Sequence, residues 1–147
     1  MITTDEAKPK KPVRILMIED DQAYILLMKK HLEDFRFPIE LFVAYDGEEA
    51  LMVLRNSMCF PFNRNPDFIL LDLGLPRVSG QEVLVKIKEN PNFRHIPVLI
   101  LTNSKVETDF NISIANDASA YLNKPGTFEE FKLFVRGIEE FWLKSNI

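Results

Sequence analysis

The sequence predicts an α/β protein in which five parallel strands form one sheet with helices on both faces. Short apolar runs rich in branched residues alternate along the chain with segments whose apolar residues recur at helical spacing. The middle runs are almost continuously apolar, as expected of strands that helices cover on both sides. Strand–helix–strand units joined by right-handed crossovers build a parallel, doubly wound sheet.

The predicted strands are short and dominated by β-branched and other apolar residues. Turn-forming residues bound several of them: Asp46 and Gly47 follow the second run, and Asn65 and Pro66 precede the third. The predicted strands are VRILMI (13–18), IELFVA (39–44), FILLD (68–72), IPVLIL (96–101) and SAYLN (119–123).

The intervening segments, and the last one, have helical periodicity, so each can turn one apolar face to the sheet. In the first helix the residues at helical spacing, which we expect on the apolar face, are Tyr24, Leu27, Met28, His31, Leu32 and Phe35. Asp21 is expected to cap this helix rather than to bind a ligand, and Ser79 is expected to cap a later one. The predicted helices span residues 21–35, 48–57, 79–90, 104–117 and 127–144.

Length and composition indicate one ordinary globular domain. The chain has 147 residues, of which 46% are hydrophobic and 27% charged. A chain of this length can bury about two-thirds of its unfolded surface. Residues 1–12 are polar and rich in lysine and proline, so we expect a flexible tail there and a single domain over residues 13–147.

Charge and hydropathy exclude several classes of protein. A net charge of −4 argues against a nucleic-acid partner, which selects basic surfaces. The polar first residues lack the apolar centre of a signal peptide, and no apolar run approaches the ~20 residues of a membrane span. The lone Cys59 excludes an internal disulfide and fits a reducing compartment. We therefore expect a cytoplasmic protein that binds neither nucleic acid nor membrane.

Polar residues stand at the C-terminal ends of four predicted strands. Glu19 and Asp20 follow the first, Asp72 ends the third, Thr102 follows the fourth and Lys124 follows the fifth. Because parallel strands all point the same way, these side chains lie along one edge, where open α/β sheets bind ligands. Carboxylates that are brought close together repel, and one takes up a proton unless a cation intervenes. Lys124 alone does not balance the three acids, so the pattern predicts Mg²⁺, which prefers hard oxygen ligands.

Four motifs resemble the receiver domain of two-component response regulators. These motifs are ED at 19–20, LDLGLPRVSG at 71–80, LTNS at 101–104 and YLNKP at 121–125. They occur in the order usual for that family, and the resemblance extends from about Val13 to Phe141. It implies a flavodoxin-like fold with five helices and the strand order 2-1-3-4-5.

The resemblance also implies the roles of the acidic residues. Asp72 would be the phosphoacceptor, a nucleophile that forms an aspartyl phosphate, and would also contact the metal. Asp20 would bind Mg²⁺ directly, and Glu19 would act mostly through metal-bound water. The backbone carbonyl of Gly74 would be a further ligand.

Three more residues would act on the phosphoryl group or respond to it. Thr102 would hydrogen-bond to it, and Lys124 would pair with one of its oxygens. Tyr121 would be the aromatic switch, turning inward as Thr102 moves. The chemistry fits, because phosphoryl transfer depends mostly on positioning and on neutralising charge.

The resemblance further implies partners. The stretches NPNFRHIPVLILTNS and GIEEFWLK resemble stand-alone receivers that partner bacterial phytochromes, chiefly in cyanobacteria. Such proteins have no output domain, so we expect a sensor histidine kinase as phosphoryl donor and a separate downstream protein that reads the phosphorylated surface. The protein would not be an enzyme, although it would assist its own phosphotransfer and dephosphorylation.

Aromatic residues crowd the last predicted helix. One stripe can face the sheet, and it consists of Phe131, Phe134, Ile138 and Phe141. Phe128, Leu133 and Trp142 do not all fit the same face. A surplus of aromatic residues suits a protein interface, so we expect a homodimer.

Three other functions are alternatives to phosphotransfer. A Mg²⁺-dependent phosphohydrolase of the haloacid dehalogenase type needs a second Asp where this chain has Gly74. A flavodoxin must cradle a flavin phosphate in its first loop, where Glu19, Asp20 and Asp21 would repel it. A receiver-like interaction module without phosphotransfer remains the main alternative, and labelling by acetyl phosphate separates it from a working receiver.

Overall fold

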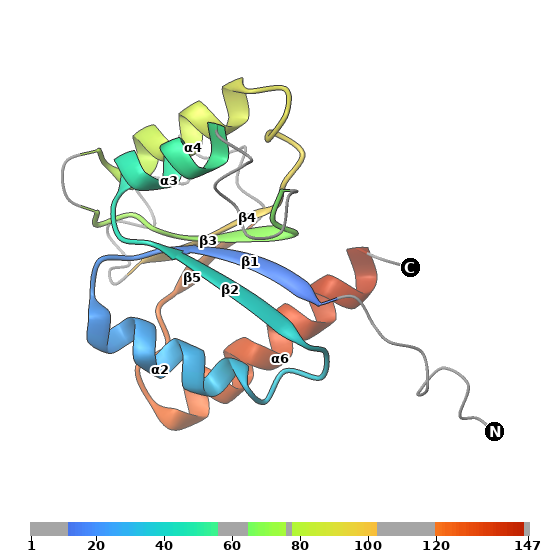
Figure 1. Ribbon diagram of the computed structural model, residues 1–147. Helices are drawn as coiled ribbons and strands as arrows, with labels where there is room; N and C mark the ends of the chain where they lie inside the picture. The colour runs from blue at the N-terminus through green and yellow to red at the C-terminus, as the bar shows by residue number, and fades with distance from the viewer. Residues whose placement is uncertain (1–11, 56–64, 76–77, 103–119, 146–147) are drawn as a thin grey trace.

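The computed structural model describes residues 12–55, 65–75, 78–102 and 120–145 of the chain (Figure 1). It contains one five-stranded sheet with the order β2-β1-β3-β4-β5, in which every neighbouring pair is parallel. The strands are β1 (Val13–Ile18), β2 (Ile39–Ala44), β3 (Phe68–Asp72), β4 (Val98–Thr102) and β5 (Ala120–Asn123). The predicted fold class and strand order are confirmed.

Helices cover both faces of this sheet. In Figure 1, α3 and α4 lie on one side of the strands and α2 and α6 on the other. The bounds are α2 (Gln22–Leu32), α3 (Gly47–Arg55), α4 (Gly80–Glu89) and α6 (Phe128–Ser145). The fifth expected helix, at 104–117, and the expected tail, except Pro12, lie outside the described residues. Within the described part of the chain, no helix is both long and apolar enough to cross a membrane.

Two hydrophobic clusters, one on each face, explain the continuous apolar runs. Alternate residues of a strand point to opposite faces. In β1, Leu16 and Ile18 join the cluster under α3 and α4, whereas Ile15 and Met17 join the cluster under α2 and α6. All of these side chains are almost fully buried, and each contributes about 1.5–3 kcal/mol to stability. A polar side chain without a partner would destabilise the fold at such a buried position, so polar residues are expected mainly at the strand ends.

Both predicted helix caps are present. The Asp21 carboxylate accepts hydrogen bonds from the backbone N–H groups of Ala23 (3.0 Å) and Tyr24 (3.2 Å) at the start of α2. Ser79 begins α4 with a capping box: its hydroxyl accepts from the Glu82 N–H, and the Glu82 carboxylate accepts from the Ser79 N–H. The two caps fix the points at which these helices leave the C-terminal edge of the sheet.

Some expectations about element boundaries and facing were wrong. Leu27 is 47% exposed, and the buried face of α2 carries Ile25, Met28 and Leu32 instead. One residue turns a helix by about 100°, so Leu27 falls outside the narrow stripe that Met28 occupies. The first helix ends at Leu32, three residues before the predicted end. The strand expected from Ile96 begins at Val98.

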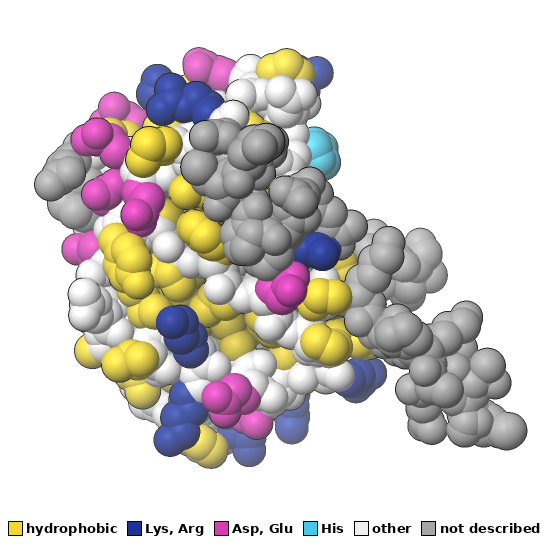
Figure 2. All heavy atoms as spheres, viewed as in Figure 1, with side chains coloured by type: hydrophobic (Ala, Val, Ile, Leu, Met, Phe, Trp, Pro, Cys, Tyr) yellow, Lys and Arg dark blue, Asp and Glu magenta, His cyan; other side chains and the backbone are white. Residues whose placement is uncertain are grey.

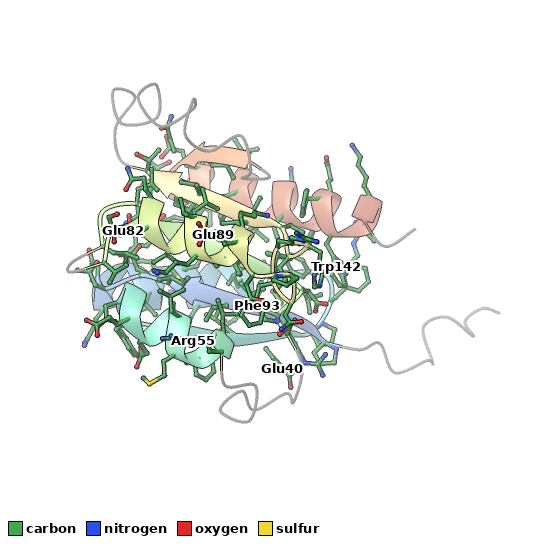
Figure 3. All side chains as sticks on the ribbon, turned by 90° about the horizontal axis from the view of Figure 1, so that it is seen from above. Glu40, Arg55, Glu82, Glu89, Phe93 and Trp142 are labelled. Carbon is green, nitrogen blue, oxygen red and sulfur yellow. The ribbon has the colours of Figure 1, made fainter. Side chains whose placement is uncertain are left out.

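The last helix packs largely as predicted. Phe131, Phe134 and Ile138 are buried against the sheet. Trp142 is partly buried, with its ring centroid 6.4 Å from that of Phe68; Figure 3 places it towards the C-terminal end of α6. Trp142 therefore packs against the hydrophobic core, and no interface is needed to explain its position. Of the residues assigned to a possible interface, Phe128 and Leu133 are the exposed ones.

Candidate functional site

The C-terminal edge of the sheet brings the predicted polar residues together. Neighbouring strands end there within one residue of each other. Ile18 and Ala44, the last residues of β1 and β2, are paired, and Ile18 also pairs with Leu71, the residue before the end of β3. Thr102 ends β4 opposite Asn123, and its carbonyl accepts a hydrogen bond of 2.8 Å from the Lys124 N–H. Figure 2 shows acidic side chains gathered on the left of the molecule, the side on which the strands end in Figure 1.

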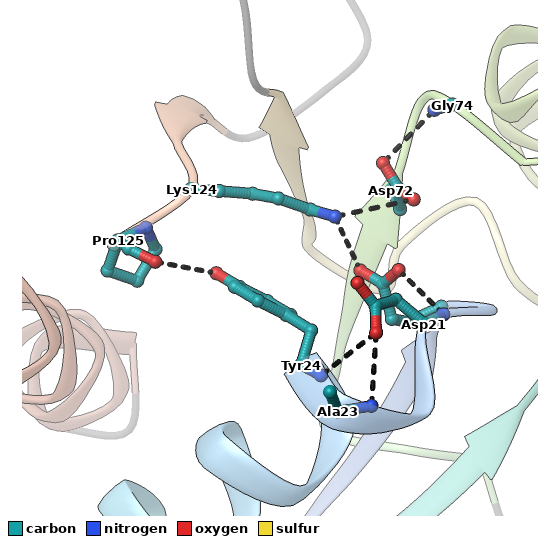
Figure 4. Close-up of polar contacts among 8 residues, drawn as sticks. Asp21, Ala23, Tyr24, Asp72, Gly74, Lys124 and Pro125 are labelled. Carbon is teal, nitrogen blue, oxygen red and sulfur yellow. Dashed lines mark hydrogen bonds and ion pairs between the residues drawn. The ribbon is translucent and has the colours of Figure 1, made fainter. Parts of the chain in front are cut away.

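Lys124 lies between two buried carboxylates (Figure 4). Its Nζ is 2.8 Å from Glu19 Oε1 and 3.5 Å from Asp72 Oδ2. The side chains of Lys124 and Asp72 are each 9% exposed, and that of Glu19 is 2% exposed. Charges so well shielded from water are tolerated only when they are paired. The Lys124 ammonium therefore pairs with both carboxylates and keeps them close together.

The pKa values show which charges this arrangement favours. Burial raises the pKa of Glu19 and the charge of Asp72 raises it further, which outweighs the hydrogen bond from Lys124. Burial lowers the pKa of Lys124, but the hydrogen bond to Glu19 and the charge of Asp72 outweigh it, so that pKa is raised. The lysine therefore stays charged, while the Glu19 carboxylate lacks enough positive charge around it. A second cation would correct this deficit.

The three acids fit such a cation. Glu19, Asp20 and Asp72 each offer a carboxylate oxygen, and these oxygens lie within 4.8 Å of one another. Glu19 and Asp72 are buried, whereas Asp20 is exposed to solvent. A cluster of hard oxygens with one side open to water suits a divalent ion that keeps part of its hydration shell. Asp21 does not join this cluster, because its carboxylate caps α2.

Backbone groups orient the two buried acids. The Asp21 N–H donates to Glu19 Oε2 at 3.1 Å, and the Gly74 N–H donates to Asp72 Oδ1 at 3.0 Å. Rotation of either carboxylate would break one of these bonds. The loop after β3 therefore presents Asp72 in a fixed orientation, with Oδ2 on the side of Lys124.

The N-terminus of α4 supports the same loop at very close range. A Cβ atom on Gly80 would lie 2.6 Å from the Cα of Leu73 and 2.7 Å from the carbonyl oxygen of Asp72. Such distances are too short for any side chain, so glycine is required for this approach. The cap at Ser79 and the absence of a side chain at Gly80 together place the first turn of α4 directly on the backbone of the acidic loop.

The structure also shows where the remaining predicted residues lie. Thr102 is completely buried at the end of β4. Gly74 is exposed, with its N–H bonded to Asp72. The backbone of Tyr121, in β5, pairs with that of Ile100 in β4, but the side chain of Tyr121 lies outside the described part of the structure.

Sequence reasoning missed one residue of the site. Tyr24 was assigned only to the apolar face of the first helix, yet its ring lies 4.6 Å from Lys124 Nζ. A weak signal was available: Tyr24 comes four residues after Asp20, about one helical turn from the acidic end of β1.

Comparison with known proteins agrees with this geometry. The model of the response regulator receiver domain matches residues 15–136. Response regulator Rcp1 of Synechocystis sp. is 37% identical over 142 residues, which cover 97% of this chain and 95% of Rcp1. The probable methanogenesis regulatory protein FilR2 of Methanothrix harundinacea is 37% identical over an alignment of 148 positions that covers 97% of this chain and 91% of FilR2.

Solved structures give the same result. The phosphorylated cyanobacterial phytochrome response regulator RcpA superposes with a TM-score of 0.78 at 34% identity, covering 92% of this chain and 96% of RcpA. The Mn²⁺-bound form of Rcp1 superposes with a TM-score of 0.75 at 34% identity, covering 90% of this chain and 95% of Rcp1. The chain therefore belongs to the response regulator receiver domain family.

Proposed function

We propose that this protein accepts a phosphoryl group on Asp72 from a sensor histidine kinase, in a Mg²⁺-dependent reaction, and signals through the resulting change in its surface. The observation that carries this proposal is the position of the Lys124 ammonium, within 3.5 Å of Asp72, beside three converging carboxylates. The proposed receiver domain spans residues 13–147.

In this reaction an oxygen of Asp72 attacks phosphorus. A bond forms between that oxygen and phosphorus, and the bond between phosphorus and the histidine nitrogen of the kinase breaks, leaving its electron pair on the nitrogen. The Gly74 N–H holds Oδ1, so the carboxylate cannot turn away from the donor. Lys124 and Thr102 contact the incoming phosphoryl oxygens and offset their negative charge.

Glu19, Asp20, Asp72 and the carbonyl of Gly74 would hold the metal. When bound, Mg²⁺ supplies the positive charge that the acids lack and that the incoming anion also needs. The raised pKa of Glu19 supports this assignment, because burial and the neighbouring Asp72 make its carboxylate unfavourable without a further cation. Lys124 supplies part of this positive charge through its 2.8 Å contact with Glu19.

Partner proteins would recognise the phosphorylated state through changes that begin at Thr102 and reach the surface near β5. Thr102 is fully buried beside Lys124, so its movement towards a phosphoryl group would leave space that Tyr121 can fill. We propose that this exchange alters the surface of β5 and α6. Leu122 and Leu133 are exposed there, at 36% and 65%, and would form part of a homodimer interface or of the surface for a downstream protein.

The identity of the kinase is a separate part of the proposal. The likeness to RcpA, a cyanobacterial phytochrome response regulator, supports a phytochrome-type kinase. The chain is 37% identical both to Rcp1 and to FilR2, so identity alone does not single out one kind of kinase. Transfer from a panel that contains a phytochrome-type kinase and other histidine kinases tests this point. We also propose a cytoplasmic location, which the lone Cys59 supports.

The direct test of phosphoacceptance uses acetyl phosphate, which needs no kinase. Wild-type protein incubated with acetyl phosphate and Mg²⁺ should gain the mass of one phosphoryl group, and Asp72→Asn should not. Asp21→Asn is the matched control, because asparagine caps helices as well as aspartate and Asp21 lies outside the acidic cluster. A wild-type protein that gains no mass, or an Asp72→Asn variant that gains it, would favour the alternative of an interaction module without phosphotransfer.

A further inference from the structure

Lys124 has to change partners during the proposed reaction. Its four-carbon side chain is flexible, and its ammonium is a point charge that can follow any nearby anion. In the structure it contacts Glu19 at 2.8 Å and Asp72 at 3.5 Å. Once a phosphoryl group is present, the charges around it differ. A group that attracts the ammonium in both states would keep it in place.

Tyr24 provides such a group. Lys124 Nζ lies over its ring, 4.6 Å from the centroid, within the ~6 Å range of a cation–π interaction. The ammonium is shielded from water, with 9% of the lysine side chain exposed, and shielding of this kind strengthens the attraction. The ring is uncharged, so it does not compete with the phosphoryl oxygens for metal or for protons.

Tyr24 is itself held on three sides (Figure 4). Its backbone N–H donates to the capping carboxylate of Asp21 at 3.2 Å. Its hydroxyl donates to the carbonyl oxygen of Pro125 at 3.3 Å, which ties α2 to the turn that follows Lys124. Its ring packs on Phe131 of α6 with the centroids 5.7 Å apart.

The Tyr24 hydroxyl remains a proton donor under ordinary conditions. Burial raises its pKa, and the negative charges of Glu19 and Asp72 raise it further. The bond to Pro125 therefore persists while the neighbouring acids change their partners. Tyr24 thus contacts two neighbouring residues. Its ring lies against the Lys124 ammonium, and its hydroxyl bonds to the backbone carbonyl of Pro125.

We propose that Tyr24 is a positioning residue for Lys124, holding its ammonium by the ring face and the Lys124–Pro125 turn by the hydroxyl while the lysine moves from Glu19 to the phosphoryl group. This inference rests on the proposed function, because it assigns Tyr24 a part in phosphotransfer to Asp72. The competing explanation is that Tyr24 only fills the edge of the core beside Phe131.

Substitutions at Tyr24 separate the ring from the hydroxyl. With acetyl phosphate as donor and saturating Mg²⁺, Tyr24→Leu should slow labelling of Asp72 about five- to thirtyfold, the range of a cation–π contact shielded from water. Tyr24→Phe keeps the ring and should slow labelling by less than about threefold. Tyr45→Leu is the control, since Tyr45 is 47% exposed just after β2 and should label at the wild-type rate.

A spectroscopic measurement reports the placement directly. An aromatic ring beneath the ammonium shifts the NMR signal of the Lys124 ε-methylene upfield, and this signal can be followed in protein that carries ¹³C-labelled lysine. Tyr24→Leu should move the signal downfield, whereas Tyr24→Phe and Tyr45→Leu should leave it in place. Thermal unfolding of each variant confirms that it is folded. A role in core packing alone would also move the signal, because the ring is lost, but it predicts that Tyr24→Leu is labelled at the wild-type rate.

The outcomes distinguish this inference from the proposed function. If wild-type protein is not labelled at all, phosphoacceptance fails. A Lys124 signal that moves in Tyr24→Leu then still supports the contact between the Tyr24 ring and the ammonium, and a signal that does not move overturns it. If wild-type protein is labelled, slower labelling of Tyr24→Leu together with a moved Lys124 signal supports the inference. A wild-type labelling rate in Tyr24→Leu, or a Lys124 signal that does not move, overturns it.

Discussion

Replacing Lys124 by methionine should destabilise the protein, because it leaves two buried carboxylates without their counter-ion. Unit charges 2.8 and 3.5 Å apart attract by roughly 5–6 kcal/mol each at an effective dielectric constant of about 20. Most of this attraction offsets the cost of removing the charges from water. Removal of one partner from such a group typically costs ~3–5 kcal/mol.

We expect Lys124→Met to lie near the lower end of that range, at about 3 kcal/mol in Mg²⁺-free buffer, because Glu19 can take up a proton. A carboxyl group whose pKa is raised in the folded state stabilises that state below its unfolded pKa and loses this contribution as pH rises through the folded value. Burial and Asp72 already raise the pKa of Glu19, and loss of Lys124 raises it further. The deficit of the variant should therefore grow from acidic to neutral pH.

Urea unfolding at neutral pH measures this cost. With a slope of about 2 kcal/mol per molar urea, a loss of about 3 kcal/mol lowers the unfolding midpoint by about 1.5 M. Lys86→Met is the matched control, because Lys86 is exposed on α4 and should change stability by less than about 0.5 kcal/mol. Equal midpoints for Lys124→Met and wild type, with EDTA present, would refute the charge balance inferred for this site.

Three other predictions concern the acidic loop, the metal and the surface. Gly80→Ala should lower the free energy of unfolding by about 1–3 kcal/mol and weaken Mg²⁺ binding, because its Cβ would lie 2.7 Å from the Asp72 carbonyl oxygen. Gly137→Ala is the control: there is open space around Gly137, so this change should stabilise α6 by about 0.5–1 kcal/mol. Mg²⁺ at 100 times its dissociation constant should stabilise the wild type by about 2.7 kcal/mol in thermal unfolding, and Asp20→Asn should lose most of that gain. Leu133→Lys should shift a homodimer to monomer in sedimentation equilibrium, and a wild type that is already monomeric would contradict the proposed homodimer.

The strand ends of the site were predictable because the geometry of a parallel sheet is nearly fixed. An apolar run such as FILLD ends at the C-terminal edge of the sheet, and the register then places Asp72 and Thr102 on adjacent strands at that edge. The helix caps at Asp21 and Ser79 were also predictable, because capping depends only on a local hydrogen bond between the side chain and the first turn of the helix. None of these inferences required knowledge of how the side chains pack.

Contacts that depend on side-chain packing were not predictable. The sequence assigned Lys124 to the edge of the sheet, but its shorter contact with Glu19 than with Asp72 depends on rotamers and burial. Tyr24 was missed because its helical position lies between the core and the site, and periodicity does not distinguish the two. Leu27 was placed on the wrong face, since an apolar residue adjacent to a buried stripe looks the same in sequence as a member of it.

Transfer of phosphate from a phosphorylated histidine kinase, followed by peptide mapping, tests the central claim most directly. In the presence of Mg²⁺ the phosphoryl group should be found on the peptide that contains Asp72, and EDTA should abolish the transfer. Phosphate on any other residue, or transfer to Asp72 that proceeds equally well in EDTA, would contradict a site in which acids from several strands depend on a divalent cation to accept another anion.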